Sequence, residues 1–192
     1  MDKTSLGAND TERQELGRRR TSKLTVLALT LVLCLVCDQL TKAIAYRALA
    51  PGPRDMLGGL IRLEYVENKG AFMGLGSALP DTTRMVLLLV LTIVVIGMLA
   101  VLAFRADSLD LLQFAGLSLI AAGGCSNLVD RVVNHGSVVD WVSVGIGWLR
   151  TGVFNVADLA VVGGGLLFLL SSFRGTRRGQ GSEAEDTPDL DG

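Results

Sequence analysis

Four long apolar segments constrain the fold of this 192-residue chain more than any other feature of its sequence. They are the run that starts at Leu24 and continues past Cys37, Met85 to Phe104, Leu109 to Val129, and Val153 to Phe173. Each is close to the roughly 20 residues that an α-helix needs to cross the hydrocarbon layer of a membrane. Charges are scarce in them, since Met85 to Phe104 has none and the last segment has only Asp158. The sequence therefore predicts a mainly α-helical membrane protein with four transmembrane helices.

Basic residues flank the first and the last of these segments. Residues 18 to 20 are arginines and Lys23 follows them, while Arg174, Arg177 and Arg178 follow the fourth segment. The first flank is also typical of a secretory signal peptide, but three further spans follow and no small-residue cleavage site is evident. We therefore interpret the first segment as a retained helix. Because cytoplasmic flanks carry an excess of Lys and Arg, we expect both termini in the cytoplasm.

The two ends of the chain are polar, unlike the apolar body between them. Residues 1–21 form an N-terminal extension and residues 175–192 an acidic tail, and neither has the apolar content to fold alone. We expect both to be disordered and cytoplasmic, which leaves residues 22–174 as one membrane-embedded domain. The formal net charge of -1, without a basic patch interleaved with aromatic residues, argues against a nucleic-acid partner.

Two segments between the spans are predicted to lie outside the membrane, on the side opposite the termini. In the first, Ile61 to Tyr65 alternates apolar and charged residues between turn-like sequences, which is typical of a half-buried strand. In the second, Asn134 to Gly136 separates two Val pairs, which indicates a tight reversal with His135 as a polar turn residue. Trp141 and Trp148 then suit the membrane interface. We expect a small sheet on the membrane surface.

The three cysteines fall within or at the ends of apolar spans, at positions 34, 37 and 125. We interpret them as small apolar packing residues and expect no disulfide framework. Together with a single histidine they offer too few ligands for a zinc site.

Polar groups inside the apolar segments need an explanation, because an unpaired ionisable residue there is costly. Asp38 and Lys42 lie four residues apart, so they share one helical face and can form an ion pair. Near the end of the third segment, Asn127, Asp130 and Arg131 also share a face. Since an amide inside a span needs a partner, we expect this face to point into the helix bundle.

Asp140 and Asp158 place two carboxylates at one membrane surface. Asp158 lies about one turn into the fourth segment, on the same face as Asn155, and Asp140 precedes that segment. When two carboxylates share a site, one pKa rises strongly, which leaves one acid and one base. Such a pair can activate water for attack on a carbonyl, which is peptide hydrolysis without a covalent intermediate. The alternative is that Asp158 only pairs with Arg131 across the bundle.

These clusters, in this order on four spans, resemble those of the bacterial lipoprotein signal peptidases (signal peptidase II) over roughly residues 24–173. The matching pieces are DQLTK, NKGAF, GGCSNLVDR, GSVVDW and FNVAD, and the ordered set is highly specific. The resemblance implies an intramembrane aspartyl endopeptidase with Asp140 and Asp158 as the catalytic pair, without a metal ion or other cofactor. It implies cleavage of diacylglyceryl-modified prolipoproteins just before the lipidated cysteine, which releases the signal peptide. Nine further residues match the family's polar support: Asp38, Lys42, Asn68, Gly70, Gly123, Asn127, Asp130, Arg131 and Asn155.

The resemblance also implies a fold and a location. The fold has four transmembrane helices, a small extracytoplasmic β-cradle and a short interfacial helix, with which the strand at 61–65 and the interfacial segment at 141–149 agree. The location is the bacterial cytoplasmic membrane. There we expect a multi-pass monomer whose partners are lipid-modified prolipoproteins and membrane lipids.

Two departures from the family pattern bear on substrate specificity. Ser126 stands where the family usually has Gly before the Asn of the third motif. After Asn68, a helix-like, glycine-rich stretch reads Ala71, Phe72 and Met73 where the family usually has two small residues and then Phe. We expect both changes to add bulk beside the substrate groove, without affecting the catalytic pair.

Two other functions fit parts of the same pattern. A metal-dependent lipid-headgroup enzyme would use Asp130, Asp140 and Asp158 as Mg²⁺ ligands. A proton-coupled transporter would use Asp38, Lys42 and Asp158 as a relay. A relay should cross the whole bilayer, however, whereas these polar residues cluster toward the outer side.

Overall fold

The computed structural model describes residues 3–70, 79–105 and 109–183 of the chain. Its four α-helices are α1 (Lys3–Ala48), α2 (Asp81–Arg105), α3 (Leu111–Val133) and α4 (Val156–Glu183), and a short 3-10 helix spans Leu57–Gly59. Each α-helix contains a stretch that is long and apolar enough to cross a membrane: Arg20–Ala48, Asp81–Ala103, Leu111–Val133 and Val156–Phe173. The four predicted spans are confirmed, and the protein is a multi-pass membrane protein.

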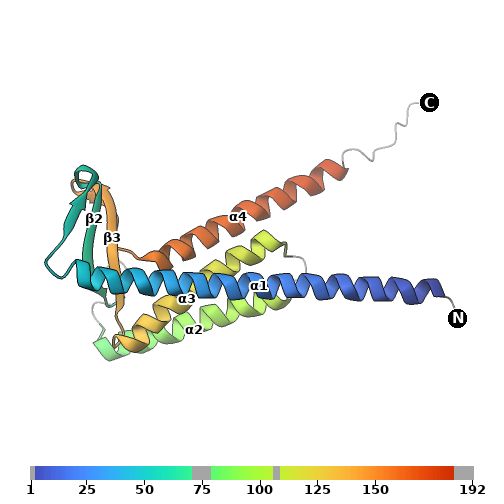
Figure 1. Ribbon diagram of the computed structural model, residues 1–192, viewed down its shortest axis with the longest axis horizontal. Helices are drawn as coiled ribbons and strands as arrows, with labels where there is room; N and C mark the ends of the chain where they lie inside the picture. Colours follow the sequence, from blue (N-terminus) through green and yellow to red (C-terminus); the bar gives the residue numbers. More distant parts are fainter. Residues whose placement is uncertain (1–2, 71–78, 106–108, 184–192) are drawn as a thin grey trace.

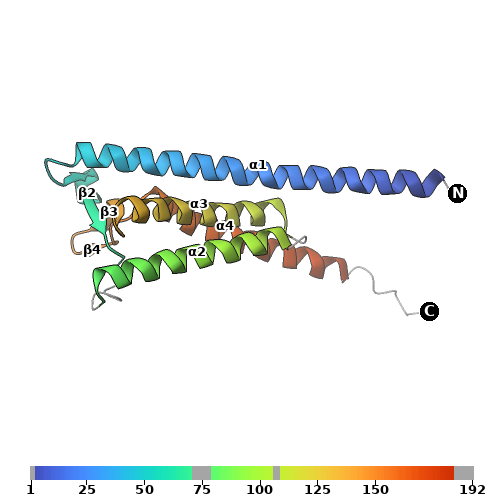
Figure 2. The same cartoon turned by 90° about the horizontal axis from the view of Figure 1, so that it is seen from below.

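Helix α3 is central in the bundle and packs against α1, α2 and α4 (Figures 1 and 2). Its start is fixed by Asp110, whose side chain and backbone exchange hydrogen bonds with the backbone and side chain of Gln113. Glycines bring α3 and α4 into close contact, since a Cβ on Gly116 would lie 2.7 Å from the carbonyl oxygen of Gly164. Small residues allow such close approach between helices in membranes.

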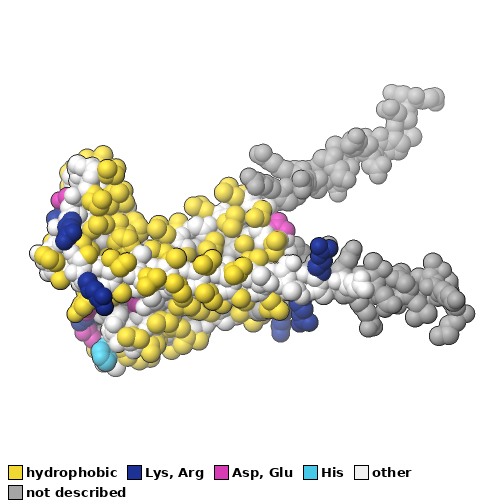
Figure 3. All heavy atoms as spheres, viewed as in Figure 1, with side chains coloured by type: hydrophobic (Ala, Val, Ile, Leu, Met, Phe, Trp, Pro, Cys, Tyr) yellow, Lys and Arg dark blue, Asp and Glu magenta, His cyan; other side chains and the backbone are white. Residues whose placement is uncertain are grey.

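The bundle has an apolar surface and a partly polar interior. No residue in the most apolar stretch of α2 is buried, and hydrophobic side chains cover the visible face of the helices (Figure 3). The buried residues instead include Asp38, Lys42, Asp130, Asp140 and Asn155. This distribution suits a protein in lipid, because polar groups there must find their partners inside the protein.

A four-stranded antiparallel sheet lies at one end of the bundle (Figure 1). Its strands are β1 (Arg54–Met56), β2 (Ile61–Asn68), β3 (Val138–Ile146) and β4 (Leu149–Arg150), in that spatial order. Although far apart in sequence, β2 and β3 pair with Val66 opposite Asp140 and Asn68 opposite Val138. The sheet therefore brings Asn68 next to the strand that carries Asp140.

The predicted reversal and the first predicted strand are confirmed. At the reversal, the Ser137 N–H donates to the Asn134 carbonyl at 3.1 Å, and Gly136 takes a φ of 97° that favours glycine. The strand predicted at 61–65 is the first part of β2. The interfacial segment at 141–149, in contrast, forms β3 and its turn into β4 instead of a helix, because its backbone pairs with β2 and with β4.

Two expectations about local structure stay predictions. The helix-like stretch that contains Ala71, Phe72 and Met73 lies outside the described residues. The division into disordered ends and a domain at 22–174 is also untested, and α1 and α4 continue into both end segments.

Candidate active site

The first turn of α4 holds two of the predicted site residues in a reciprocal cap. Asn155 directly precedes the helix, and its side-chain oxygen accepts a hydrogen bond from the Asp158 N–H at 2.9 Å. In return, Asp158 Oδ2 accepts one from the Asn155 N–H at 3.2 Å. This capping-box arrangement satisfies backbone donors that the start of a helix leaves unpaired. The sequence NVAD therefore fixes the Asp158 carboxylate at the N-terminal end of α4.

Asp140 lies on β3 and is held by amides from two other segments. Asn155 Nδ2 donates to Asp140 Oδ1 at 2.7 Å, and Asn68 Nδ2, at the end of β2, donates to Oδ2 at 2.9 Å. Asn68 is itself oriented, because its Oδ1 accepts a hydrogen bond from the Gly70 N–H at 2.8 Å. Gly70 has a φ of 80°, which explains the glycine at this position.

Asn127 on α3 completes the connection between the two carboxylates. Its Nδ2 donates to Asp158 Oδ1 at 2.9 Å, and its Oδ1 accepts from Asn155 Nδ2 at 3.1 Å and from Lys42 Nζ at 3.3 Å. The expectation that this residue faces the bundle interior is confirmed. Three asparagine amides thus donate to the two aspartates: Asn68 and Asn155 to Asp140, and Asn127 to Asp158.

A buried ion network beneath the asparagines positions both aspartates at once. Lys42 Nζ lies 2.6 Å from Asp38 Oδ2 and 2.8 Å from Asp130 Oδ2, so the predicted i, i+4 ion pair is confirmed and extended. Each carboxylate also accepts a backbone hydrogen bond at 2.9 Å, Asp38 from Ala157 of α4 and Asp130 from Val139 of β3. The two donor residues directly precede the two site aspartates in the chain.

Two side chains in this network were not predicted from the sequence. Gln39 Nε2 donates to Asp130 Oδ1 at 2.7 Å, and Ser126 Oγ donates to Asp38 Oδ2 at 2.7 Å. The sequence did contain a signal for them: Gln39 and Ser126 are polar residues in apolar helices, so each needs a hydrogen-bond partner, as Asp38 does.

The expectation that Ser126 adds bulk beside the substrate groove is wrong. Ser126 is fully buried, and its hydroxyl reaches from α3 to Asp38 on α1. Its neighbour Asn127 is turned about 100° around the helix from it and contacts Asp158, whereas Ser126 contacts Asp38. Ser126 therefore supports the ion network around Lys42 by its hydrogen bond to Asp38.

Asp140 and Asp158 share one cavity with a volume of about 720 Å³. Its polar lining includes Asn68 and Arg131 beside the two carboxylates. Its apolar lining comes from β2, α2, α4 and the segment before α4: Val66, Leu88, Val153, Phe154, Val161 and Val162. The cavity therefore places two carboxylates next to a surface suited to hydrocarbon.

Arg131 borders this cavity but does not pair with Asp158. Its guanidinium donates to the Asn127 carbonyl at 3.4 Å, and its Nε is buried without a hydrogen-bond partner in the described chain. The Asp158 oxygens accept from Asn127 and Asn155 instead. The alternative that Asp158 only forms an ion pair with Arg131 across the bundle is therefore wrong.

The surroundings of Asp140 raise the pKa of its carboxyl from 3.8 to about 6. Burial is the main cause, because it removes water from the charged form, and the nearby Asp158 charge raises the pKa further. Hydrogen bonds from Asn68 and Asn155 oppose this rise. A carboxyl with such a pKa can hold and release a proton near neutral pH, as acid–base catalysis requires.

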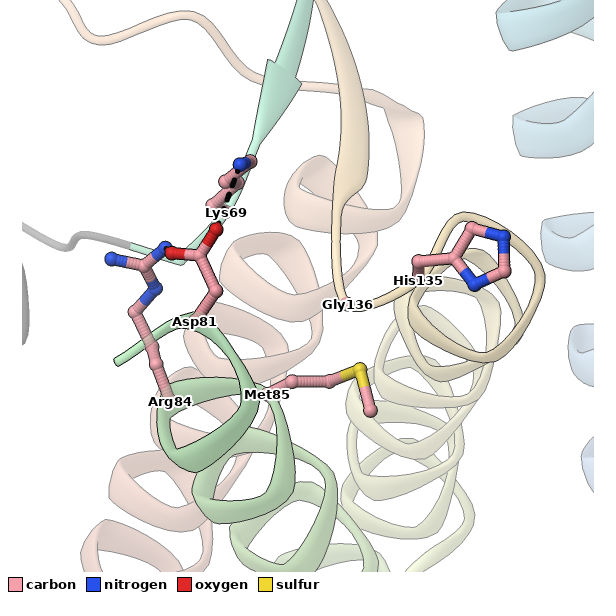
Figure 4. Close-up of a pocket in the computed structure, with 6 residues that line it drawn as sticks. All are labelled: Lys69, Asp81, Arg84, Met85, His135 and Gly136. Atoms are coloured by element: carbon pink, nitrogen blue, oxygen red, sulfur yellow. Dashed lines mark hydrogen bonds and ion pairs between the residues drawn. The ribbon is translucent and has the colours of Figure 1, made fainter. Parts of the chain in front are cut away.

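A second polar cluster lies at the start of α2, apart from this site. Asp81 accepts hydrogen bonds from Arg84 at 2.6 Å and from Lys69 at 3.0 Å (Figure 4). His135 borders the same hollow of about 40 Å³, on the far side from Lys69 (Figure 4). Because the Asp81 side chain is 68% exposed, we assign these ion pairs to the protein surface. His135 is an exposed turn residue, as predicted.

The three carboxylates that the metal-dependent alternative needs, Asp130, Asp140 and Asp158, do not converge on one point. Within residues 3–70, 79–105 and 109–183, no group of three or more His, Cys, Asp or Glu side chains converges as metal ligands would. Asp130, which that alternative combines with the two site aspartates, binds Lys42 and Gln39.

Comparison with known proteins identifies the family of this chain. The family model described as signal peptidase (SPase) II matches residues 30–174. The lipoprotein signal peptidases of Caldicellulosiruptor bescii and Mycolicibacterium smegmatis are each 38% identical to this chain, over 132 and 181 residues. The first alignment covers 69% of this chain and 80% of its relative, and the second covers 88% and 70%.

A solved structure shares the fold. It is described as a bacterial membrane enzyme determined by the in meso method at 1.9 Å resolution, and it superimposes with a TM-score of 0.65 at 26% identity. The superposition covers 76% of this chain and 90% of that chain. The sequence motifs, the fold and these matches lead to one conclusion. The chain belongs to the signal peptidase II family, the aspartic-type membrane proteases that remove signal peptides from prolipoproteins.

Proposed function

We propose that Asp140 and Asp158 are the catalytic pair with which this chain cleaves prolipoproteins. One contrast among these four carboxylates carries the proposal: Asp38, Asp130, Asp140 and Asp158. Asp38 and Asp130 both form ion pairs with Lys42, whereas Asp140 and Asp158 line a common cavity and accept hydrogen bonds from neutral amides. Two carboxylates that share a cavity and form no ion pair within the described residues are suited to sharing a proton.

In the proposed reaction, Asp158 is the base and Asp140 is the acid. Asp158 takes a proton from water as the water oxygen attacks the scissile carbonyl carbon. Asp140, whose raised pKa favours the protonated form, gives its proton to the carbonyl oxygen. The gem-diol then collapses as the C–N bond breaks. Its hydroxyl proton returns to Asp140, and the proton on Asp158 goes to the leaving amine.

The apolar lining of the cavity supports a lipid-bearing substrate. Leu88 and Val161 lie on membrane-spanning helices, so an acyl chain can reach the two carboxylates from within the bilayer. A cysteine that carries diacylglycerol would place its preceding peptide bond at the catalytic pair while its chains lie against this lining. We therefore propose cleavage just before the lipidated cysteine.

The remaining matched residues receive supporting roles in this proposal. Asn68, Asn127 and Asn155 hold the carboxylates, and Gly70 orients Asn68. Gly123 allows α4 to approach α3, because a Cβ there would clash with the Ala157 carbonyl. The network around Lys42 fixes the backbones that carry the pair, and Arg131 offers a planar donor at the cavity wall.

We also propose an orientation in the bacterial cytoplasmic membrane, with both termini in the cytoplasm and the sheet outside. The basic flanks of the first and last spans support it. The site would then open on the side where exported prolipoproteins are found. We also propose that the protein acts as a monomer and has no nucleic-acid partner, the latter because its formal net charge is -1 and no basic patch is interleaved with aromatic residues.

Incubation of the purified protein with a diacylglyceryl-modified precursor tests this function. The readout is the gel shift caused by loss of the signal peptide, and the same precursor without lipid is the matched control. Cleavage restricted to the lipidated form and unchanged by a chelator supports the proposal. Inhibition by the chelator would favour metal-dependent chemistry, and vesicle flux without cleavage would favour a transporter.

A further inference from the structure

A second apolar groove lies apart from the active site, toward the N-terminal end of the α1 span. It has a volume of about 170 Å³ and lies on α3 between α1 and α2. Helix α3 packs against both neighbours, whereas α1 and α2 stand apart (Figure 2). The residues used below are Leu27 and Leu31 of α1, Ala100 of α2, and Phe114, Ser118 and Cys125 of α3. We call this the α1–α2 groove.

The α1–α2 groove is suited to a hydrocarbon chain and not to water. Its hydroxyl group, Ser118 Oγ, already donates to the Phe114 carbonyl at 2.8 Å. Apolar cavities with satisfied polar groups stay dry. Ala100 is exposed at the rim, so the groove is open to the bilayer.

The length of the groove matches one leaflet of a membrane. Along α3 it extends from Phe114 to Cys125, which is about 16 Å at a rise of 1.5 Å per residue. The hydrocarbon layer is about 30 Å thick, so the groove spans about half of it. This is the depth that one acyl chain of a phospholipid occupies.

A half-buried cation stands at the end of the groove. Lys23 Nζ lies 5.6 Å from the centre of the Phe114 ring, and Lys23 precedes Leu27 by four residues on the same face of α1. Arg20 lies one turn earlier. Figure 3 shows Lys and Arg side chains where the apolar body ends toward the N-terminus. Lys23 forms no ion pair with any carboxylate in the described part of the chain, so its charge can pair with a lipid phosphate.

We propose that the α1–α2 groove binds one anionic phospholipid. An acyl chain lies on α3 between α1 and α2, and the headgroup phosphate pairs with Lys23. This is a different site from the one proposed for the substrate, because the two cavities share no lining residue. The proposed ligand is a membrane lipid of the leaflet that borders the basic residues before the first span, and not the substrate.

Native mass spectrometry of the full chain in detergent tests the charge component. Phosphatidylglycerol and phosphatidylcholine with identical acyl chains are added at equal concentration. We expect about a five-fold preference for phosphatidylglycerol from one basic residue, and its loss in Lys23→Gln. The matched control is Arg105→Gln, since Arg105 is an exposed cation at the end of α2 beside an open apolar surface. This variant should keep the preference.

Filling the rim tests the groove itself. Ala100→Phe should reduce the binding of both lipids, while a cooperative thermal unfolding transition shows that the variant is folded. Full lipid binding by Ala100→Phe would overturn the proposal. So would an unchanged preference in Lys23→Gln, or an equal loss of preference in Arg105→Gln. Should Ala100→Phe not fold, the comparison of Lys23→Gln with Arg105→Gln decides. Neither arm depends on the proposed catalytic pair.

Discussion

Asn155 and Asp158 cap one another across the first turn of α4. The same Asn155 uses its other side-chain atom, Nδ2, to donate to Asp140 at 2.7 Å. One residue therefore starts the helix and connects the two carboxylates, with different atoms for the two roles. Substitutions can separate these roles.

Asn155→Ser should keep the helix start, because Ser caps a helix about as well as Asn. It removes the Nδ2 donor to Asp140, and misplacement of a catalytic group can cost about 10²-fold in rate. Asn155→Ala removes both roles and should also destabilise the protein by about 0.5–2 kcal/mol. Thermal unfolding and precursor cleavage measure the two effects. Wild-type cleavage by Asn155→Ser would show that the amide does not hold Asp140 in its working position.

Lys42→Met should destabilise the fold strongly. The Lys42 side chain is 5% exposed and forms ion pairs with Asp38 and Asp130, which would then be buried carboxylates without their cation. Removing one partner of a buried ion pair costs about 3–5 kcal/mol. The matched control is Lys69→Met, because the Lys69–Asp81 pair is exposed and should not change the Tm. Equal Tm values for the two variants would contradict a structural role of the network.

Gly123→Ala should disturb the site through α4. The added Cβ would clash with the Ala157 carbonyl and approach Val161 Cγ2 to 2.8 Å, so α4 must move away from α3. Overpacking of this kind costs about 1–3 kcal/mol. Gly163→Ala on α4 is the matched control, since its Cβ meets nothing within 4 Å. We expect slower cleavage and a lower Tm only for Gly123→Ala. A wild-type rate in that variant would argue against close packing at this point.

The pKa of Asp140 predicts how stability depends on pH. The pKa is about 6 in the folded protein against an ordinary 3.8, so the folded state binds more protons between these pH values. Stability conferred by Asp140 is therefore present at low pH and falls as the pH rises from about 4 to about 6. The full loss corresponds to about 3 kcal/mol. Unfolding measurements should show Asp140→Asn gaining stability over wild type across this range, because Asn does not ionise. A difference that stays constant with pH would exclude this cause.

The spans and the polar helix faces could be predicted because a lipid environment leaves few structures open to an apolar or a polar segment. The first strand could be predicted from its alternating apolar and charged residues. An apolar run about 20 residues long can bury its backbone polar groups only as a helix. Polar residues inside such a run need partners, so the sequence predicts an ion pair between Asp38 and Lys42 and a position for Asn127 that faces the bundle interior. The pair of aspartates followed from the same reasoning together with the family resemblance.

Other features depend on contacts that no local pattern encodes. The backbone N–H groups of Ala157 and Val139, which bind Asp38 and Asp130, have no side-chain signature. The role of Ser126 depends on how α3 is rotated against α1. The segment after Trp141 contains residues typical of a membrane interface, yet its conformation is decided by pairing with β2.

Cleavage rates of the two aspartate variants test the central claim most directly. Asp140→Asn, Asp158→Asn and the double variant are purified in folded form and incubated with the diacylglyceryl-modified precursor at equal enzyme concentration. If the pair shares one proton, each single variant should lose about 10⁴-fold in rate, as expected for residues that act as a unit. The double variant should then be little slower than either single variant. Cleavage near the wild-type rate by either single variant would contradict the two-carboxylate mechanism.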